Sequence, residues 1–270
     1  MRFAPRTPRE GINVSEEHPL VEAGTLIIGI AFIFAVITVA LIFLVEIALY
    51  FVPVEKEAAL FDNWLPEDIL TVSPNDARLK KVDAILWRLS QHYPESPYKF
   101  RVEIDDSEDM NAMALPGGLI VVTAGLLDAL ESENELAFIL GHEMGHFKNR
   151  DHMRALGRGV VLGIMFVAIS GSGAGTDLGA SITDLALRGF SRGQEAAADK
   201  FGLGIVQQEY AHIADSWRFF ERIDAGDDDL LELMTYLSTH PSPDNRVEVL
   251  IEYAGANGWP ISGDVTALDW

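Results

Sequence analysis

The sequence predicts a mostly helical α+β fold with a small antiparallel or mixed sheet, preceded by one membrane-spanning helix. The first indication is an uncharged stretch of twenty residues near the N-terminus, Leu26 to Val45. Beyond it, the longer segments carry apolar residues at the spacing of amphipathic helices. Only two short segments read as strands: Arg101 to Asp105, which alternates, and Leu119 to Thr123, which precedes Gly125. So few and such short strands predict a small sheet within a helical domain.

Length and composition limit the function classes. A chain of 270 residues has room for one compact domain plus appendages. The 20 basic and 41 acidic residues give a formal net charge of −21, which argues against nucleic acid as a partner, because phosphate binding needs a basic patch. The chain has no cysteine, so disulfides and thiolate metal ligands are excluded.

The predicted membrane helix covers residues 26–52, with a tail at residues 1–25 before it. Its uncharged stretch matches the thickness of the hydrocarbon core at helical rise, and the helix stops at Pro53. The alternative is a cleaved signal peptide. The apolar run is too long for one, and no clear cleavage site follows it. We therefore expect a lipid bilayer as a partner of this chain.

The few basic residues around this helix predict its orientation. Arg2, Arg6 and Arg9 precede the helix, whereas only Lys56 follows it closely. The positive-inside rule then leaves the N-terminus in the cytoplasm and the rest of the chain on the other side. In a bacterium this means a single-pass protein of the inner membrane with a periplasmic domain.

The remaining chain is expected to form one domain at residues 76–255, after a linker at 53–75 and before a tail at 256–270. Its first helix, Asp76 to Gln91, carries an apolar stripe that predicts core packing. The stripe consists of Leu79, Val82, Ile85, Leu86 and Leu89.

The most informative motif is His142-Glu143-Met144-Gly145-His146. Residues four apart lie on the same face of a helix, so both imidazoles could bind one zinc ion. Glu143 lies beside the first ligand, where it could take a proton from a zinc-activated water. A catalytic zinc usually takes three protein ligands, so one more donor is needed.

Glu195 is the candidate for the third ligand. Ser191 and Gln194 form the pattern of a capping box, which predicts a helix with Glu195 in its first turn. Asp199 follows four residues later on the same face, where a carboxylate could fix the tautomer of a ligating histidine.

These residues together resemble the gluzincin metallopeptidases of family M48. The resemblance covers about residues 76 to 255 and rests on five motifs in order. They are Asn111 to Gly118, Leu119 to Thr123, Leu136 to His146, Glu195 to Asp199, and Ser238 to Arg246. It implies a zincin-like domain whose zinc ion is held by His142, His146 and Glu195.

The resemblance also implies roles for further residues. His240 is expected to donate a hydrogen bond to the oxyanion, with Glu143 as the general base. Arg246 is expected to bind substrate or, preferably, to hold the third-ligand helix through a salt bridge. An edge strand around Asn111 and Ala112 is expected to pair with an extended peptide, which recognises main chain rather than sequence.

A second apolar run, Gly159 to Ser170, follows the metal-binding helix. It is too short to span a bilayer. We expect a buried continuation of that helix or a flap over the cleft, with shallow contact with the bilayer as the alternative.

The expected function is that of a membrane-anchored zinc metalloendopeptidase. Its substrates would be polypeptides, unfolded or membrane-associated, in protein quality control. The alternative is a proteolytically latent, membrane-anchored chaperone or adaptor that retains the zinc site.

Overall fold

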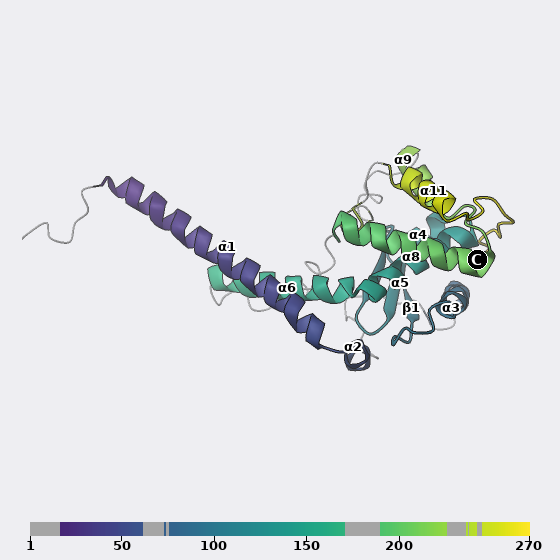
Figure 1. Ribbon diagram of the computed structural model, residues 1–270, viewed down its shortest axis with the longest axis horizontal. Coiled ribbons are helices and arrows are strands. Elements are labelled where there is room, and N and C mark those ends of the chain that lie inside the picture. Colours follow the sequence, from purple (N-terminus) through teal and green to yellow (C-terminus); the bar gives the residue numbers. More distant parts are fainter. Residues whose placement is uncertain are drawn as a thin grey trace, which may run out of the picture.

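A long N-terminal helix leads into a helical domain with one small sheet (Figure 1). The computed structural model describes residues 17–61, 73, 76–170, 190–225, 236, 238–241 and 245–270. The three N-terminal arginines and most of the predicted linker lie outside these residues. The helices are α1 (Pro19–Phe51), α2 (Val54–Leu60), α3 (Ala77–Ser90), α4 (Ala124–Ala129), α5 (Glu133–Asn149), α6 (Asp151–Ser170), α8 (Arg192–Tyr210), α9 (Arg218–Ala225) and α11 (Arg246–Ala256). The strands are β1 (Arg101–Asp105), β2 (Ala112–Leu115) and β3 (Leu119–Thr123).

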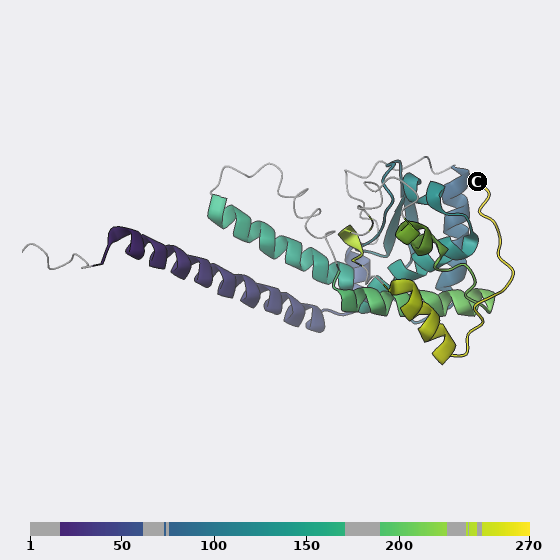
Figure 2. The same ribbon diagram turned by 90° about the horizontal axis from the view of Figure 1, so that it is seen from above.

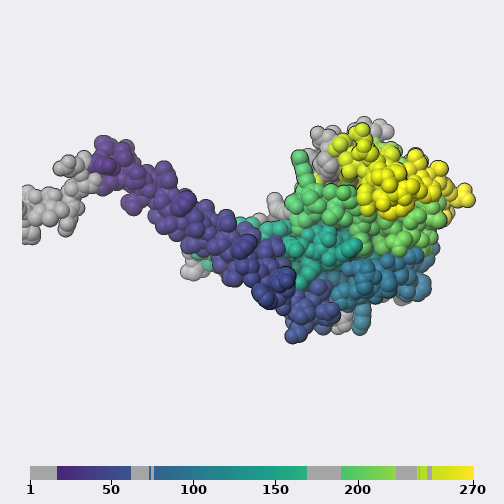
Figure 3. Space-filling view, viewed as in Figure 1, coloured from purple at the N-terminus to yellow at the C-terminus, as the bar shows by residue number. Residues whose placement is uncertain are grey.

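Helix α1 extends away from the domain, and none of its residues is buried (Figures 1 and 3). It begins seven residues before the predicted start at Leu26, because the His18 side chain caps it and Pro19 occupies its first turn. Within the described part of the chain, it is the one helix long and apolar enough to cross a membrane. This helix is consistent with the predicted membrane span.

The first part of the predicted linker forms helix α2, which packs against the domain. Helix α2 docks on the domain through Glu57, which is only 2% exposed. Its carboxylate accepts from Tyr98 Oη at 2.5 Å, from Arg150 Nε at 2.9 Å and from His152 Nε2 at 2.7 Å. Charge-assisted hydrogen bonds in a buried place are strong, so α2 belongs to the domain and does not act as a loose spacer.

The expected C-terminal tail also packs on the domain. The Glu133 N–H donates to the Thr266 carbonyl at 2.9 Å, and the Leu268 N–H donates to the Glu131 carbonyl at 3.0 Å. The Leu268 side chain is buried. These backbone bonds fix the segment beside the start of α5, which apolar periodicity could not predict.

The sheet has the strand order β1-β3-β2, with β1 parallel and β2 antiparallel to β3. The prediction of a small mixed sheet is confirmed. Every residue of β3 is buried, as expected for a central strand. Strand β2 pairs with β3 alone within this sheet, so its other side is an edge.

The core lies between the sheet and the helices α3, α5 and α8. The predicted stripe of α3 is confirmed by the buried side chains of Val82, Ile85, Leu86 and Leu89. Almost all of α5 is buried, and α8 lies directly against it. The two backbones touch: a Cβ on Gly202 would lie 2.7 Å from the His142 nitrogen, and a Cβ on Gly145 would lie 2.7 Å from Ala198 Cα.

Helix α6 is separate from α5, which ends at Arg150 in the left-handed conformation (φ 57°). It contains the apolar run Gly159 to Ser170 and lies beside α1 (Figures 1 and 2). Several of its large apolar side chains, such as Ile164 and Phe166, are exposed. Val161 and Met165 of the same run are buried. The run therefore forms a separate helix that is buried on only part of its surface, in place of the expected buried continuation of the metal-binding helix.

Two glycines of α8 form a matched pair for testing the contact between α5 and α8. A methyl group at Gly202 would collide with the α5 backbone, whereas one at Gly204 would lie 3.5 Å from the Trp259 ring, an ordinary contact. We expect Gly204→Ala to stabilise the protein by about 0.5 kcal/mol through helix propensity. We expect Gly202→Ala to destabilise it by about 2 kcal/mol through overpacking. Chemical denaturation of the detergent-solubilised protein measures both. Equal effects of the two substitutions would contradict the contact.

Candidate metal centre

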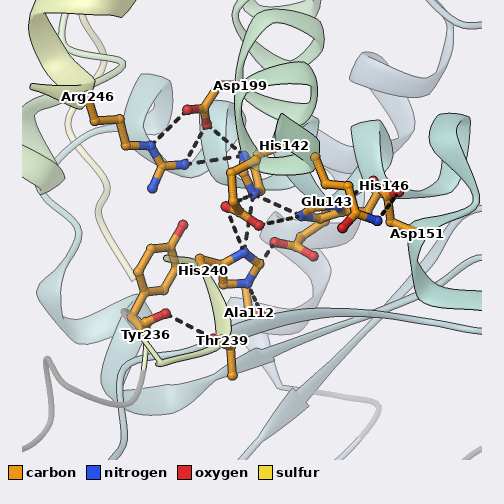
Figure 4. A network of polar contacts seen from close by, with 12 residues as sticks. Ala112, His142, Glu143, His146, Asp151, Asp199, Tyr236, Thr239, His240 and Arg246 are labelled. Atoms are coloured by element: carbon orange, nitrogen blue, oxygen red, sulfur yellow. Dashed lines mark hydrogen bonds and ion pairs between the residues drawn. The ribbon is translucent and has the colours of Figure 1, made fainter. Parts of the chain in front are cut away.

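Three donor atoms converge in the core of the domain (Figure 4). His142 and His146 lie one turn apart on α5, and Glu195 lies in the first turn of α8, whose capping box between Ser191 and Gln194 is present as predicted. The distance between the two Nε2 atoms is 3.1 Å. The Glu195 oxygens lie 3.3 Å from His142 Nε2 and 3.5 Å from His146 Nε2. We call these three residues the metal centre.

The spacing of these atoms fits one tetrahedral metal ion. Ligands at about 2.05 Å from a tetrahedral ion lie about 3.3 Å from one another. The three observed distances, from 3.1 to 3.5 Å, bracket that value. All three side chains are at most 1% exposed. Neither Glu195 oxygen makes a hydrogen bond within the described residues, as expected of a carboxylate placed for a cation.

Carboxylates behind the histidines orient both rings. His142 Nδ1 lies 2.8 Å from an oxygen of Asp199, and His146 Nδ1 lies 3.1 Å from an oxygen of Asp151. A proton on each Nδ1 satisfies these carboxylates and leaves a lone pair on each Nε2. Two lone pairs only 3.1 Å apart beside Glu195 repel one another unless a cation lies between them.

The electrostatics of the site favour a positive charge. Burial by itself lowers the pKa of His142, but the charges of Glu195 and Asp199 outweigh burial and raise this pKa to about 10. The pKa of Glu195 is lowered despite its burial, because His240 and His142 stabilise the ionised form. The site therefore stabilises either a proton or a metal ion between its nitrogens and the carboxylate.

Arg246 lies against Asp199. Its Nε donates to one Asp199 oxygen at 2.9 Å, and its Nη2 donates to the other. Burial raises the pKa of Asp199, but the charge of Arg246 and the bond to His142 hold this pKa below its usual value. The guanidinium also lies 4.0 Å from the centre of the Phe220 ring. Arg246 thus connects α11 to α8 at the residue that orients His142.

Glu143 is fully buried, and neither of its oxygens makes a hydrogen bond within the described residues. The ion-pair contact of Glu143 within the described residues is with His240, whose Nε2 lies 3.6 Å from Glu143 Oε1. Burial of a carboxylate without hydrogen bonds is unfavourable in free energy, which indicates that Glu143 binds a water or a substrate group. This carboxylate lies on the same turn as His142, beside the metal centre.

His240 lies against the metal centre from the C-terminal part of the chain. Its Nδ1 is 3.3 Å from His142 Nε2 and 3.4 Å from a Glu195 oxygen. Its Nε2 lies 3.1 Å from the Ala112 carbonyl, and its ring stacks on Tyr236 with centroids 4.9 Å apart. Together with Glu143 and the two other histidines, it forms a group of donor atoms all within 4.8 Å of one another. Its Nδ1 can therefore act toward anything bound at the centre.

Hydrogen bonds link the start of the edge strand β2 to His240. Ala112 accepts from His240, and the Asn111 side chain accepts from Thr239 Oγ1 at 3.0 Å and from the Ala112 N–H at 3.0 Å. The Asn111 amide thus supports the segment that carries His240. The Thr123 N–H donates to the Asn111 carbonyl, so the backbone of Ala112 is directed away from β3. There the Asn111 side chain binds the Ala112 N–H and His240 binds its carbonyl.

Sequence reasoning missed Asp151. This residue is 1% exposed and binds His146, while Gln194 Nε2 donates to its other oxygen at 2.6 Å. It lies five residues after His146, beyond the left-handed Arg150, so helical spacing does not place it on the ligand face. The available signal was an acidic residue just past the end of the helix that carries the ligands.

Comparisons with known proteins agree with this geometry. A family model described as peptidase family M48 matches residues 75–254. The chain is 28% identical over 214 residues to the mitochondrial metalloendopeptidase OMA1 of Bos taurus, covering 70% of this chain and 40% of that protein. It is 31% identical over 197 residues to the OMA1 of Danio rerio, covering 66% of this chain and 41% of that protein.

A bacterial relative matches over more of its own length. The chain is 28% identical over 200 residues to the metalloprotease LoiP of Escherichia coli, covering 70% of this chain and 75% of LoiP. By contrast, the chain spans only about 40% of the length of the two OMA1 proteins. The family model covers more than half of the chain and includes every residue of the metal centre, so this chain belongs to peptidase family M48.

Proposed function

We propose that this chain is a membrane-anchored zinc-dependent metalloendopeptidase that hydrolyses peptide bonds in polypeptides. The observation that carries the proposal is the convergence of three metal donors beside the buried carboxylate of Glu143, which makes no hydrogen bond within the described residues. The relatives named metalloendopeptidase and metalloprotease support the same reaction. The apolar helix α1 supports the anchor.

Zinc is the proposed metal, held by His142, His146 and Glu195. Two imidazoles and a carboxylate with tetrahedral spacing are typical of a catalytic zinc site that keeps one position open. When bound, zinc supplies Lewis acidity, which lowers the pKa of a coordinated water and polarises a carbonyl. The carboxylates of Asp199 and Asp151 keep the lone pairs of both histidines directed at this position.

Glu143 acts as the general base and acid in this proposal. Its carboxylate takes a proton from the attacking water and passes it to the leaving amine. The absence of hydrogen bonds to Glu143 within the described residues leaves both oxygens free to receive that proton. His240 supplies the oxyanion contact: while its Nε2 binds the Ala112 carbonyl, a proton on its Nδ1 is directed at the metal centre.

Substrate binding is proposed at the edge of the sheet formed by Asn111 and Ala112. An extended peptide added to β2 binds by its main chain, which favours unfolded segments of many sequences. With the anchor, this suggests quality control of membrane-associated polypeptides. We place the chain in the inner membrane of a bacterium, in a single pass, with its catalytic domain on the periplasmic side.

The decisive test is Glu143→Gln in the full-length protein. The substitution keeps size and packing but removes the base, so casein hydrolysis should fall by about 10² to 10⁴-fold while the zinc content is unchanged. Proteolysis by the unaltered protein should stop on chelation and return with added zinc. Full activity of the variant would refute this mechanism. Absence of cleavage by the zinc-loaded wild type would favour the latent chaperone or adaptor.

His240→Ala separates the proposed oxyanion contact from metal binding. Loss of one oxyanion donor should lower kcat by about 10² to 10³-fold with little change in zinc affinity. Zinc affinity is measured by competition with a fluorescent chelator. A large loss of zinc in this variant would instead show that His240 is a ligand, and the assignment to the oxyanion would be wrong.

Asp151→Asn tests whether the carboxylate that binds His146 Nδ1 affects the zinc affinity of the metal centre. The amide keeps the shape of the side chain but removes the charge that holds the His146 tautomer. Zinc affinity should therefore weaken by about 10 to 100-fold. Asp83→Asn, on the exposed face of α3, is the matched control and should bind zinc as the wild type does. Equal affinities in the two variants would contradict the role of Asp151.

A further inference from the structure

Helix α6 leaves the domain in the same direction as the membrane anchor. Figure 2 shows the two helices extending side by side from the domain, and contacts join them along their length. From Phe34 to the end of α1, the less exposed residues form one stripe at helical spacing, which we take as the face that contacts α6. These residues are Phe34, Thr38, Leu41, Ile42, Val45, Glu46 and Leu49.

The contact between the helices is close near the domain. A Cβ on Gly157 would lie 2.3 Å from the Val45 side chain, so a glycine is needed for this approach. Arg154 Nε donates to Glu46 Oε2 at 2.9 Å, and the same guanidinium lies 3.3 Å from Asp151. The polar contacts therefore lie at the domain end of the helix pair.

Beyond these polar contacts, α6 carries only uncharged residues. From Gly159 to Ser170 no side chain is charged. Val160 and Leu162 are exposed, as are Ile164 and Phe166, the last two at 55% and 61%. At helical spacing these four side chains lie on two sides of α6, to either side of the buried Val161 and Met165. Large apolar side chains facing water are unfavourable and typically mark a surface covered by something apolar.

We propose that residues 159–170 of α6 insert into the bilayer beside α1, with lipid acyl chains covering the exposed apolar side chains. The position of α6 beside α1 supports lipid as the occupant. The exposed residues of α6 lie alongside the uncharged stretch of α1 (Figure 2). Twelve residues of helix span about 18 Å of the roughly 30 Å hydrocarbon core, so α6 reaches about the middle of the bilayer without crossing the membrane.

The charged residues mark the membrane surface. Glu46, Arg154 and Arg158 lie where the apolar stretches of both helices begin, and long arginine side chains reach the headgroups readily. Asp151, which binds the metal ligand His146, precedes Gly159 by only eight residues. At helical rise this places the metal centre within about 15 Å of the hydrocarbon boundary.

The substrate class follows from this position and rests on the proposed peptidase function. A metal centre so close to the bilayer can reach the segment of a membrane-anchored polypeptide that lies next to its membrane anchor. Most of a soluble folded domain would lie too far from the membrane surface to reach the metal centre. The proposed substrates are therefore chains cleaved near the point where they leave the membrane.

Membrane insertion is tested by spin labels in full-length protein reconstituted into vesicles of phosphatidylethanolamine and phosphatidylglycerol. The chain has no cysteine, so single cysteines can be introduced without background. Phe166→Cys is compared with Ile33→Cys on α1 as the lipid reference and with Trp87→Cys on α3 as the water reference; both positions are exposed, at 57% and 64%. Oxygen and a water-soluble nickel complex serve as paramagnetic probes.

We expect the label at Phe166 to match the one at Ile33, accessible to oxygen and protected from nickel. Accessibility to nickel, as at Trp87, would show that α6 lies in water. Protection from both probes would show that protein covers it, either a second copy of the chain or another part of the same chain. Each of the last two results overturns the proposal, and none depends on peptidase activity.

The substrate class is tested with one peptide sequence in two forms, free in solution and attached to a membrane helix in the same vesicles. Phe166→Arg places a charge in the proposed acyl region and should lower cleavage of the anchored form relative to the free form by about tenfold. An unchanged ratio would refute the substrate class. Failure of the wild type to cleave either form would instead refute the proposed function and leave the spin-label result standing.

Discussion

The close approach of α5 and α8 is the constraint on which the metal centre depends. Gly145 and Gly202 allow these two backbones to touch, and any side chain there would push the helices apart. The two histidines lie on one helix and the third donor on the other, so the donor separations of 3.1 to 3.5 Å exist only at this helix spacing. A shift of one methyl group between the helices would exceed the tolerance of a metal-ligand distance.

Charge balance explains how so many polar groups remain buried at this place. Asp199 is neutralised by Arg246, and Asp151 binds His146, Gln194 and Arg154.

Within the described residues, the carboxylates of Glu143 and Glu195 make no hydrogen bond, and their ion-pair contacts are with histidine nitrogens at 3.3 to 3.6 Å. One divalent cation would balance both charges and satisfy the lone pairs of the two imidazoles. The carboxylates behind the ligands thus have hydrogen-bonded partners, whereas those facing the centre have only these longer contacts with histidine. This separation assigns different roles to acids only a few ångströms apart.

Local spacing made part of this centre predictable from the sequence. The pairs His142 and His146, and Glu195 and Asp199, are each four residues apart on helices, and the capping box of the second helix could be read directly. Within a helix, such spacing fixes relative position without knowledge of the fold. The two helices could be paired only through the resemblance to a known family, because no local rule states which helices touch.

Contacts that depend on distant or non-helical backbone were not predictable. Asp151 reaches His146 only because Arg150 turns the chain in the left-handed region. Glu57 meets Arg150 across 93 residues of sequence. The apolar run of α6 reads equally well as a core helix, since apolar periodicity shows which face avoids water and not whether protein or lipid covers it. The position of α6 along α1 depends on tertiary contacts, which no local sequence pattern predicts.

Arg150 links the end of the predicted membrane helix α1 to α5, the helix that carries the two histidines of the metal centre. Its left-handed backbone ends α5 four residues after His146, and its side chain donates to the carbonyls of Leu49 and Val52 at the end of α1, at 2.6 and 2.9 Å. A cation there satisfies carbonyls that the helix leaves free and interacts favourably with the helix dipole. The same guanidinium pairs with Glu57 on α2.

One side chain therefore sets the distance from the anchor to the metal centre. A single membrane helix joined by a rigid contact would still let the domain turn about the helix axis. A second inserted helix beside the first removes that freedom, because two parallel attachments define a plane. With α1 and α6 both in the bilayer, the metal centre would face the membrane surface in one fixed orientation.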